Sequence, residues 1–336
     1  QIDQTFFVMT DQYNVYKCIS NYGGVASTVK PTGQSSAIIE TSDNYRWKFM
    51  YEVQQADVLK YVTTDWIPVK YLTSNDGTAQ WTVQQAAVDG ALEHIDVTSG
   101  GTGYVNTNTG TALAGSTTTT IVLAATASAT NDVYNSMTVF ISSGTGSGQI
   151  KVITDYVGST YTATVSAWST NPDNTSVYEV MPAVTITTTE GTGAAARVSS
   201  VIGGIIKKVS MTAVGTLYRS GTATLTGGGG SGATVEPRIG PKGGHGKNPK
   251  TELGGAYVML NVRLTGTEGG DFAVGDDFRK VILIANPLAS GAAATATTYS
   301  GVELDDDSGE QIYVEYRAPI NRASDQTEDV KLVVEF

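Results

Sequence analysis

A run of acidic residues near the C-terminus is the strongest candidate in this sequence for binding a metal ion. Residues 305–307 are three consecutive aspartates, with Glu303 and Glu310 close by. Carboxylate oxygens are the ligands that Ca²⁺ and Mg²⁺ prefer, but the run lacks the alternating ligand spacing and the distal glutamate of a calcium loop. Residues 308–309 are Ser-Gly, so a solvated turn is the preferred interpretation, as it is for residues 276–277.

Nucleophilic or zinc chemistry would need a histidine or cysteine beside suitable partners, and the chain has only His94, His245 and Cys18. Cys18 stands in an apolar stretch and is interpreted as a small buried residue. Carboxylate pairs could support glycoside hydrolysis, but an acidic β-protein contains many such pairs by chance. The sequence therefore predicts no catalytic, cofactor-binding or metal-binding residue.

The charge of the chain argues against a nucleic-acid partner. Its 336 residues carry a formal net charge of −11, and the only basic stretch is residues 242–250 (KGGHGKNPK). Binding to phosphates requires clustered Lys and Arg, and the Gly and Pro content of this stretch favours a mobile linker. No run of 18 or more apolar residues and no secretory signal are found, so neither a membrane partner nor export is expected. A single cysteine fits assembly in a reducing cytoplasm, and we expect further sequence to precede Gln1.

The elements that would have to position any site are strands. The chain is rich in Thr, Ser, Gly and Val, and no long stretch has apolar residues at helical spacing, which is typical of an all-β fold. In residues 44–53, four aromatic residues alternate with Arg46, Lys48, Met50 and Glu52, which predicts a half-buried strand. Residues 55–61 are predicted to form a short helix or a turn. Further strands are predicted in both flanks of the chain, at residues 4–9, 14–19, 256–264, 279–284, 311–316 and 330–336.

The middle of the chain contains an internal duplication. Residues 90–104 and 204–218 align without a gap at Gly, Thr, Gly, Thr and Tyr, and residues 185–194 align with residues 224–233. In the second copy the two halves adjoin, whereas in the first they are separated by a long insertion. His94 aligns with Lys208, and a position that accepts either residue is expected on an exposed strand face.

These patterns predict three nested parts. Residues 1–86 and 240–336 share strand-rich, aromatic-bearing character and would form one discontinuous β-sandwich. Residues 87–114 and 182–239 would form an inserted, duplicated β-repeat domain. Residues 115–181 would form a small β-module nested in the first repeat, with strands at 137–141, 149–153, 161–165 and 176–180. Insertion into a surface loop costs little entropy, so such nesting is physically reasonable.

Both flanks resemble a known family. Residues 308–336 (SGEQIYVEYRAPINRASDQTEDVKLVVEF) resemble the end of the baseplate wedge subunit of T-even-type contractile-tailed bacteriophages. Residues 278–288, 15–18 and 43–53 are similar to other segments of that family. The resemblance implies a β-structure with one domain inserted in another, subunits present as pairs, and no catalytic residue. It does not extend to the middle of the chain, whose Gly/Thr-rich repeats look like those of phage tail and fibre proteins.

The resulting hypothesis is a structural component of a phage tail baseplate wedge, assembled in the host cytoplasm and located in the virion. Its partners would be other wedge proteins and a second copy of itself. Arg317, Pro319 and Asn321, within the most specific family motif, are the candidate partner contacts, although a role in stabilising the local turn is also open. The alternatives are a receptor-binding tail protein that touches host glycans through the inserted repeats, and a carbohydrate-active enzyme.

Overall fold

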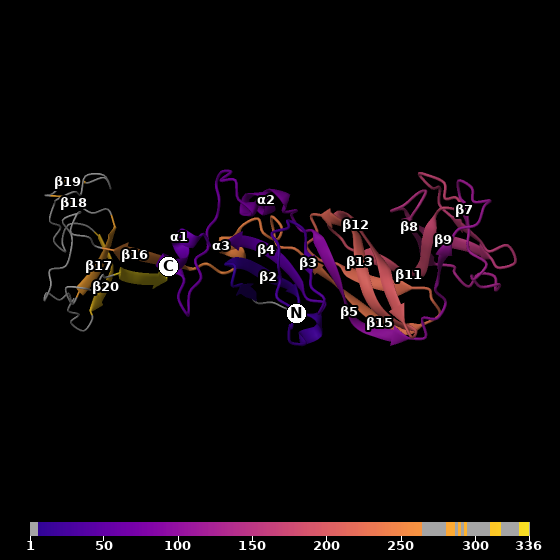
Figure 1. Ribbon diagram of the computed structural model, residues 1–336, viewed down its shortest axis with the longest axis horizontal. Helices are drawn as coiled ribbons and strands as arrows, with labels where there is room; N and C mark the ends of the chain where they lie inside the picture. The colour runs from indigo at the N-terminus through magenta and orange to yellow at the C-terminus, as the bar shows by residue number, and fades with distance from the viewer. Residues whose placement is uncertain are drawn as a thin grey trace. The chain divides into compact units, whose positions relative to one another are not determined.

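The computed structural model describes residues 6–263, 280–285, 288–289, 292–293, 310–316 and 329–335 (Figure 1). The chain divides into two compact units. The first unit comprises Gln1–Gln55 and Val69–Gly255, and the second comprises Ala56–Pro68 and Ala256–Phe336. Antiparallel sheets dominate both, which confirms the prediction of an all-β fold.

The first unit begins with a four-stranded sheet, the N-terminal sheet, whose order is β1-β2-β4-β3. Its strands are β1 (Phe7–Met9), β2 (Asn14–Ser20), β3 (Ile39–Glu40) and β4 (Arg46–Glu52). A short 3₁₀ turn, η1 (Tyr22–Gly24), follows β2. The apolar core of this sheet contains Tyr16, Cys18, Trp47 and Phe49, and the rings of Tyr16 and Phe49 meet edge to face.

Strand β4 is buried on both faces, so the prediction of a half-buried strand is wrong. Arg46 is 9% exposed and Lys48 is 2% exposed, although both lie on the charged face. The Nζ of Lys48 donates to the carbonyl of Ser36 (2.7 Å) and lies 3.7 Å from a carboxylate oxygen of Glu93. The charged face is therefore covered by polar partners from other segments of the chain, both before and after β4, rather than by water.

Two helices in the first unit bring side-chain amides onto neighbouring backbone. Helix α2 (Ala79–Ala86) buries Gln84, whose side chain accepts from the N–H of Leu72 and donates to its carbonyl. Helix α3 (Pro249–Glu252) is capped by Asn248, whose Oδ1 accepts from the N–H of Thr251. Both helices are short and come from segments without a clear helical period, which is why the sequence did not predict them.

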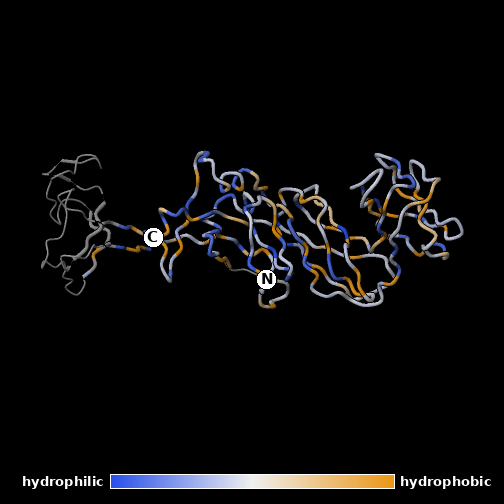
Figure 2. Tube along the Cα trace, viewed as in Figure 1, coloured by the Kyte–Doolittle hydropathy of each residue, from blue (hydrophilic) through white to orange (hydrophobic). Residues whose placement is uncertain are grey.

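The duplicated region forms what we call the repeat unit, with strand order β5-β15-β14-β11-β12-β13. Figure 2 shows apolar and polar segments alternating along these strands. The strands of the repeat unit are β5 (Leu92–Thr102), β12 (Thr192–Ile202), β13 (Ile205–Thr216), β14 (Thr222–Thr226) and β15 (Ser231–Ile239). The second half of β11, a strand that spans Val177–Thr187, also belongs to it.

The two copies make reciprocal contacts in this unit. The N–H of Tyr104 donates to the carbonyl of Gly204, and the N–H of its equivalent, Tyr218, donates to the carbonyl of Gly90, both at 3.0 Å. These four residues are paired by the sequence alignment as Gly90 with Gly204 and Tyr104 with Tyr218. The contacts are thus those of an approximate two-fold arrangement.

Strand β11 begins in another group of strands, which we call the nested module, and continues into the repeat unit, so that both belong to one sheet (Figure 1). Its residues from Ala183 onward pair with β14, whereas those up to Pro182 pair with β8. The remaining strands of the module are β6 (Asn108–Thr111), β7 (Thr120–Val122), β8 (Met137–Ser143), β9 (Ile150–Val157) and β10 (Thr162–Val165). One continuous strand therefore links the module to the repeats.

The described residues of the second unit form three two-stranded sheets. These are β16 (Tyr257–Arg263) with β21 (Asp329–Glu335), β17 (Lys280–Ala285) with β20 (Glu310–Tyr316), and β18 (Leu288–Ala289) with β19 (Ala292–Ala293). Helix α1 (Gln55–Tyr61) contacts the first of them, because the Nδ2 of Asn261 donates to the carbonyl of Lys60 (2.6 Å). Residues 55–61 are a helix, one of the two forms that the sequence allowed. The division into a discontinuous sandwich, a repeat domain and a nested module stays a prediction.

Candidate functional site

The three predicted partner contacts, Arg317, Pro319 and Asn321, lie outside the described residues, as does the acidic run at residues 305–307. The strand that leads to them, β20, ends at Tyr316, whose side chain is 74% exposed.

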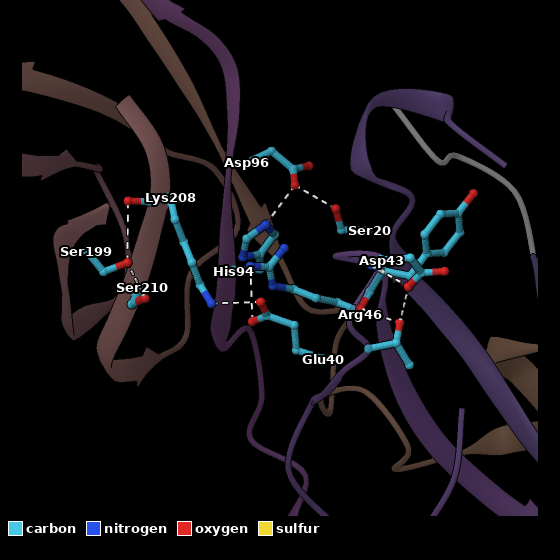
Figure 3. Close-up of polar contacts among 11 residues, drawn as sticks. Ser20, Glu40, Asp43, Arg46, His94, Asp96, Ser199, Lys208 and Ser210 are labelled. Carbon is cyan, nitrogen blue, oxygen red and sulfur yellow. Dashed lines mark hydrogen bonds and ion pairs between the residues drawn. The ribbon is translucent and has the colours of Figure 1, made fainter. Parts of the chain in front are cut away.

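The described residues gather charged side chains in the first unit, where the N-terminal sheet meets the repeat unit (Figure 3). The sequence did not single out this group, which we call the junction cluster. It consists of Ser20, Glu40, Arg46, His94, Asp96, Lys208 and Arg238.

Asp96, on β5, accepts hydrogen bonds from three directions. The Oγ of Ser20 lies 2.7 Å from its Oδ1, and the Nε2 of His94 lies 2.7 Å from the same oxygen. The Nε of Arg238 donates to its Oδ2 at 2.5 Å. Asp96 thereby connects β2 of the N-terminal sheet with β5 and β15 of the repeat unit.

Glu40, at the end of β3, makes a second connection. The Nζ of Lys208, on β13, donates to its Oε1 at 2.7 Å, and the Nη2 of Arg46 lies 3.3 Å from its Oε2. Both copies of the duplicated segment thus contribute to one cluster, through the aligned positions His94 and Lys208. Beside Lys208, the hydroxyl groups of Ser199 and Ser210 lie 2.7 Å apart (Figure 3).

Burial and pairing act against each other in this cluster. Burial raises the pKa of Asp96, but the hydrogen bonds from His94 and Ser20 outweigh it and hold the pKa of that carboxyl well below its usual range. Burial likewise opposes the partners of Glu40, and the hydrogen bond from Lys208 together with the charge of Arg46 keeps its pKa lowered. Both carboxyl groups are therefore ionised near neutral pH.

His94 is 5% exposed, so the expectation of an exposed strand face is wrong. The alignment of His94 with Lys208 reflects two positions that face the same charged cluster, not two positions that face water. Burial lowers the pKa of His94 most strongly, and the positive charge of Arg46 lowers it further, against the opposing effect of Asp96.

The geometry of the cluster differs from that of a catalytic triad. In a triad the imidazole stands between serine and carboxylate, so that it can take the serine proton. Here Asp96 stands between Ser20 and His94, and it accepts from both. Within the described ranges, no group of three or more His, Cys, Asp and Glu side chains is arranged to hold a metal ion. The junction cluster can hold two sheets together, and its arrangement does not activate Ser20 as a nucleophile.

The basic stretch at residues 242–250 is held by contacts, contrary to its interpretation as a mobile linker. The carboxylate of Glu252 lies 3.2 Å from the Nζ of Lys17, pairs with the Nδ1 of His245, and accepts from the N–H of Gly246 at 2.7 Å. Burial raises the pKa of Glu252, but the contact with His245 outweighs this effect and leaves its pKa lowered. The two histidines of the chain thus each pair with a carboxylate.

Cys18 is 2% exposed, which confirms its interpretation as a buried residue, and burial raises the pKa of its thiol to about 12. Only the thiolate is a nucleophile. We therefore expect that, at pH 8, a disulfide-exchange reagent reacts with the folded chain roughly a thousandfold more slowly than with the chain unfolded in guanidinium chloride. Following the reaction by absorbance measures both rates. Rates within tenfold of each other would contradict the buried position of this thiol.

Comparison with known proteins concerns the C-terminal part of the chain. Residues 259–336 match the family model Phage-Gp8, described as Bacteriophage T4, Gp8. No curated protein and no solved structure matches the chain. No helix within the described ranges is long and apolar enough to cross a membrane. The family match supports a structural protein of the baseplate wedge type from a phage tail.

Proposed function

We propose that this chain is a structural component of a phage tail baseplate wedge that joins neighbouring baseplate proteins and pairs with a second copy of itself. The observation that carries the proposal is the family match over residues 259–336. That segment lies entirely in the second unit, which has its own strand pairs and nearly all of helix α1. We place the partner contacts at Arg317, Pro319 and Asn321, beside the exposed Tyr316.

The first unit suits a protein that transmits force between neighbours. Its repeat unit and nested module share strand β11. The paired charges of the junction cluster join the N-terminal sheet to the repeat unit. Buried, hydrogen-bonded charges specify one geometry, because a shifted arrangement would leave them unpaired. This supports a role in which surfaces far apart along the chain are held at fixed spacing. The repeats would then serve as spacing elements related to those of other phage tail proteins.

The contact residues allow a direct test by assembly. We expect the triple variant Arg317→Ala, Pro319→Ala and Asn321→Ala to lower incorporation into particles at least tenfold, because loss of a binding hot spot costs about 2 kcal/mol or more and about 1.4 kcal/mol is tenfold in affinity. Incorporation is measured by quantitative mass spectrometry of purified tails produced with the variant as the sole source of this chain.

A control separates contact from folding. The variant Asp155→Ala alters an exposed residue of β9 in the nested module and is expected to be incorporated normally. The triple variant should also keep the unfolding midpoint of the parent chain. Normal incorporation of a folded triple variant would rule out these three residues as contacts. A trimer of this chain at the tail periphery, with its repeats exposed, would favour the receptor-binding alternative.

A further inference from the structure

The N-terminal sheet and the repeat unit have separate apolar cores. The first contains Tyr16, Trp47 and Phe49, and the second contains Leu92 and Val209, with no residue common to both. Apolar packing within each core is insensitive to protonation. What holds the two sheets against each other has to be sought among the polar groups between them.

Those polar groups form a small set of contacts that cross the junction. The Ser20 hydroxyl donates to Asp96, and the Lys208 ammonium donates to Glu40, both at 2.7 Å. Each of these two contacts has one member in the N-terminal sheet and one in the repeat unit, as does the longer Lys48–Glu93 pair at 3.7 Å. Their strength depends on the ionisation of their members, so the closeness of the two sheets is coupled to charge.

His94 pairs with Asp96 and also feels the charges of Arg46 and Glu40, and ion pairs link these groups to further charged groups on β13 and β15. They balance when the imidazole is neutral, because three cations face three carboxylates. The groups are Glu40 on β3, Arg46 on β4, Asp96 on β5, Lys208 on β13, and Glu236 and Arg238 on β15.

We propose that this junction is an acid-sensitive joint, in which protonation of His94 adds an unmatched positive charge and lets the N-terminal sheet separate from the repeat unit. Asp96 accepts from His94, Ser20 and Arg238, but its single negative charge is already matched by the Arg238 guanidinium, so it has limited capacity to neutralise an imidazolium as well. Opening the junction exposes His94 to water, which solvates the added charge.

The direction of the pH dependence follows from the lowered pKa of His94. A group whose pKa is lower in the closed form than in water favours the closed form while it is neutral. The closed junction is thus fully stabilised above pH 6.5, the ordinary value for histidine, and loses stability as the pH falls toward the lowered pKa. The open population should rise by up to about tenfold per pH unit in that window.

This inference does not depend on the proposed function. The junction lies in the first unit, among residues that the family model does not match. Failure of the assembly test would leave the joint untouched, and a rigid junction would leave the baseplate proposal untouched.

Single-molecule energy transfer tests the joint in the full chain. Dyes are attached at Thr32→Cys, in the N-terminal part, and Thr222→Cys, on β14, since both positions are exposed. Cys18→Ala removes the native thiol from this background. We expect one transfer population at pH 7.5 and a second population of lower transfer that grows as the pH falls from 6.5 to 5.

Two variants assign the response. In His94→Gln, the amide can still donate to Asp96 but cannot be protonated, so the single population should persist at pH 5. His245→Gln, the matched control at the other histidine, should respond like the parent. A parent chain with one population throughout, or a His94→Gln variant that opens as the parent does, would overturn the proposal.

A measurement on the unsubstituted chain covers the case in which His94→Gln fails to fold. The two histidine resonances are followed by NMR as a function of pH and assigned with the His245→Gln variant. A His94 pKa below 6.5 is expected. A value above 6.5 would mean that Asp96 stabilises the imidazolium, that acid tightens the junction, and that the proposal is wrong.

Discussion

Alanine at Gly101 or at Gly215 is expected to lower the free energy of unfolding of the first unit by about 2–5 kcal/mol, since left-handed strain and overpacking add. The two glycines are equivalent in the duplicated segments and have φ angles of +58° and +60°. A Cβ at Gly101 would lie 2.4 Å from the carbonyl oxygen of Ser231, and one at Gly215 would lie 2.5 Å from that of Thr192. Both obstacles are backbone, which cannot rotate away.

The duplication also supplies the comparison. Ser231 and Thr192 occupy equivalent places in the two copies, so the two alanine variants should lose similar amounts of stability. Gly203→Ala is the matched control, because Gly203 has a φ of +60° and nothing within 4 Å of a Cβ. It should cost about 1–2 kcal/mol, from the backbone strain alone.

Urea unfolding followed by circular dichroism measures all three variants. Equal costs for Gly101→Ala and Gly203→Ala would mean that the close approach at Gly101 does not exist. Very different costs for Gly101→Ala and Gly215→Ala would contradict the reciprocal packing of the two copies.

Asp96→Ala is expected to lower the free energy of unfolding by about 3–5 kcal/mol, because removing one partner of a buried ion pair leaves the other charge uncompensated. It leaves Arg238 and the Ser20 hydroxyl without their partner in a largely buried site. Asp155→Ala removes an exposed aspartate of β9 and should change stability by less than about 0.5 kcal/mol. Thermal and urea unfolding at pH 7 give both values.

The same carboxylate predicts a pH dependence. Because the pKa of Asp96 is lowered in the folded chain, its contribution is fully present above pH 3.8 and is lost as the pH falls below that value. The stability difference between the parent and Asp96→Ala should therefore shrink in acid. A difference that is small at pH 7, or that grows below pH 3.8, would show that Asp96 does not join the two sheets.

The sequence predicted many strands of this chain but not β12, because period-two alternation is a local property that not every strand shows clearly. Residues 137–141 and 14–19 were predicted as strands and lie in β8 and β2. Helix α2 was missed because its eight residues give little periodic signal. Three of them are glutamines, and its buried face carries one large apolar side chain, that of Val83.

The environment of the charged residues could not be predicted in the same way. Arg46 and Lys48 alternate with aromatic residues as a solvated face would, and only the tertiary structure shows that Glu40 and Glu93 cover them. His94 was misplaced for a related reason, because its partner Asp96 also binds Ser20 and Arg238, which are far away in the sequence. A weak signal was present, since His94 and Asp96 alternate on one face just as Lys208 and Ser210 do in the second copy.

The most direct test of the central proposal is a cryo-electron microscopy reconstruction of the phage tail that contains this chain. We expect density for the chain within the baseplate, in two copies per wedge, with residues 317–321 against a neighbouring protein. Density only at the outer tip of a fibre, as a trimer with the duplicated strands facing outward, would contradict it.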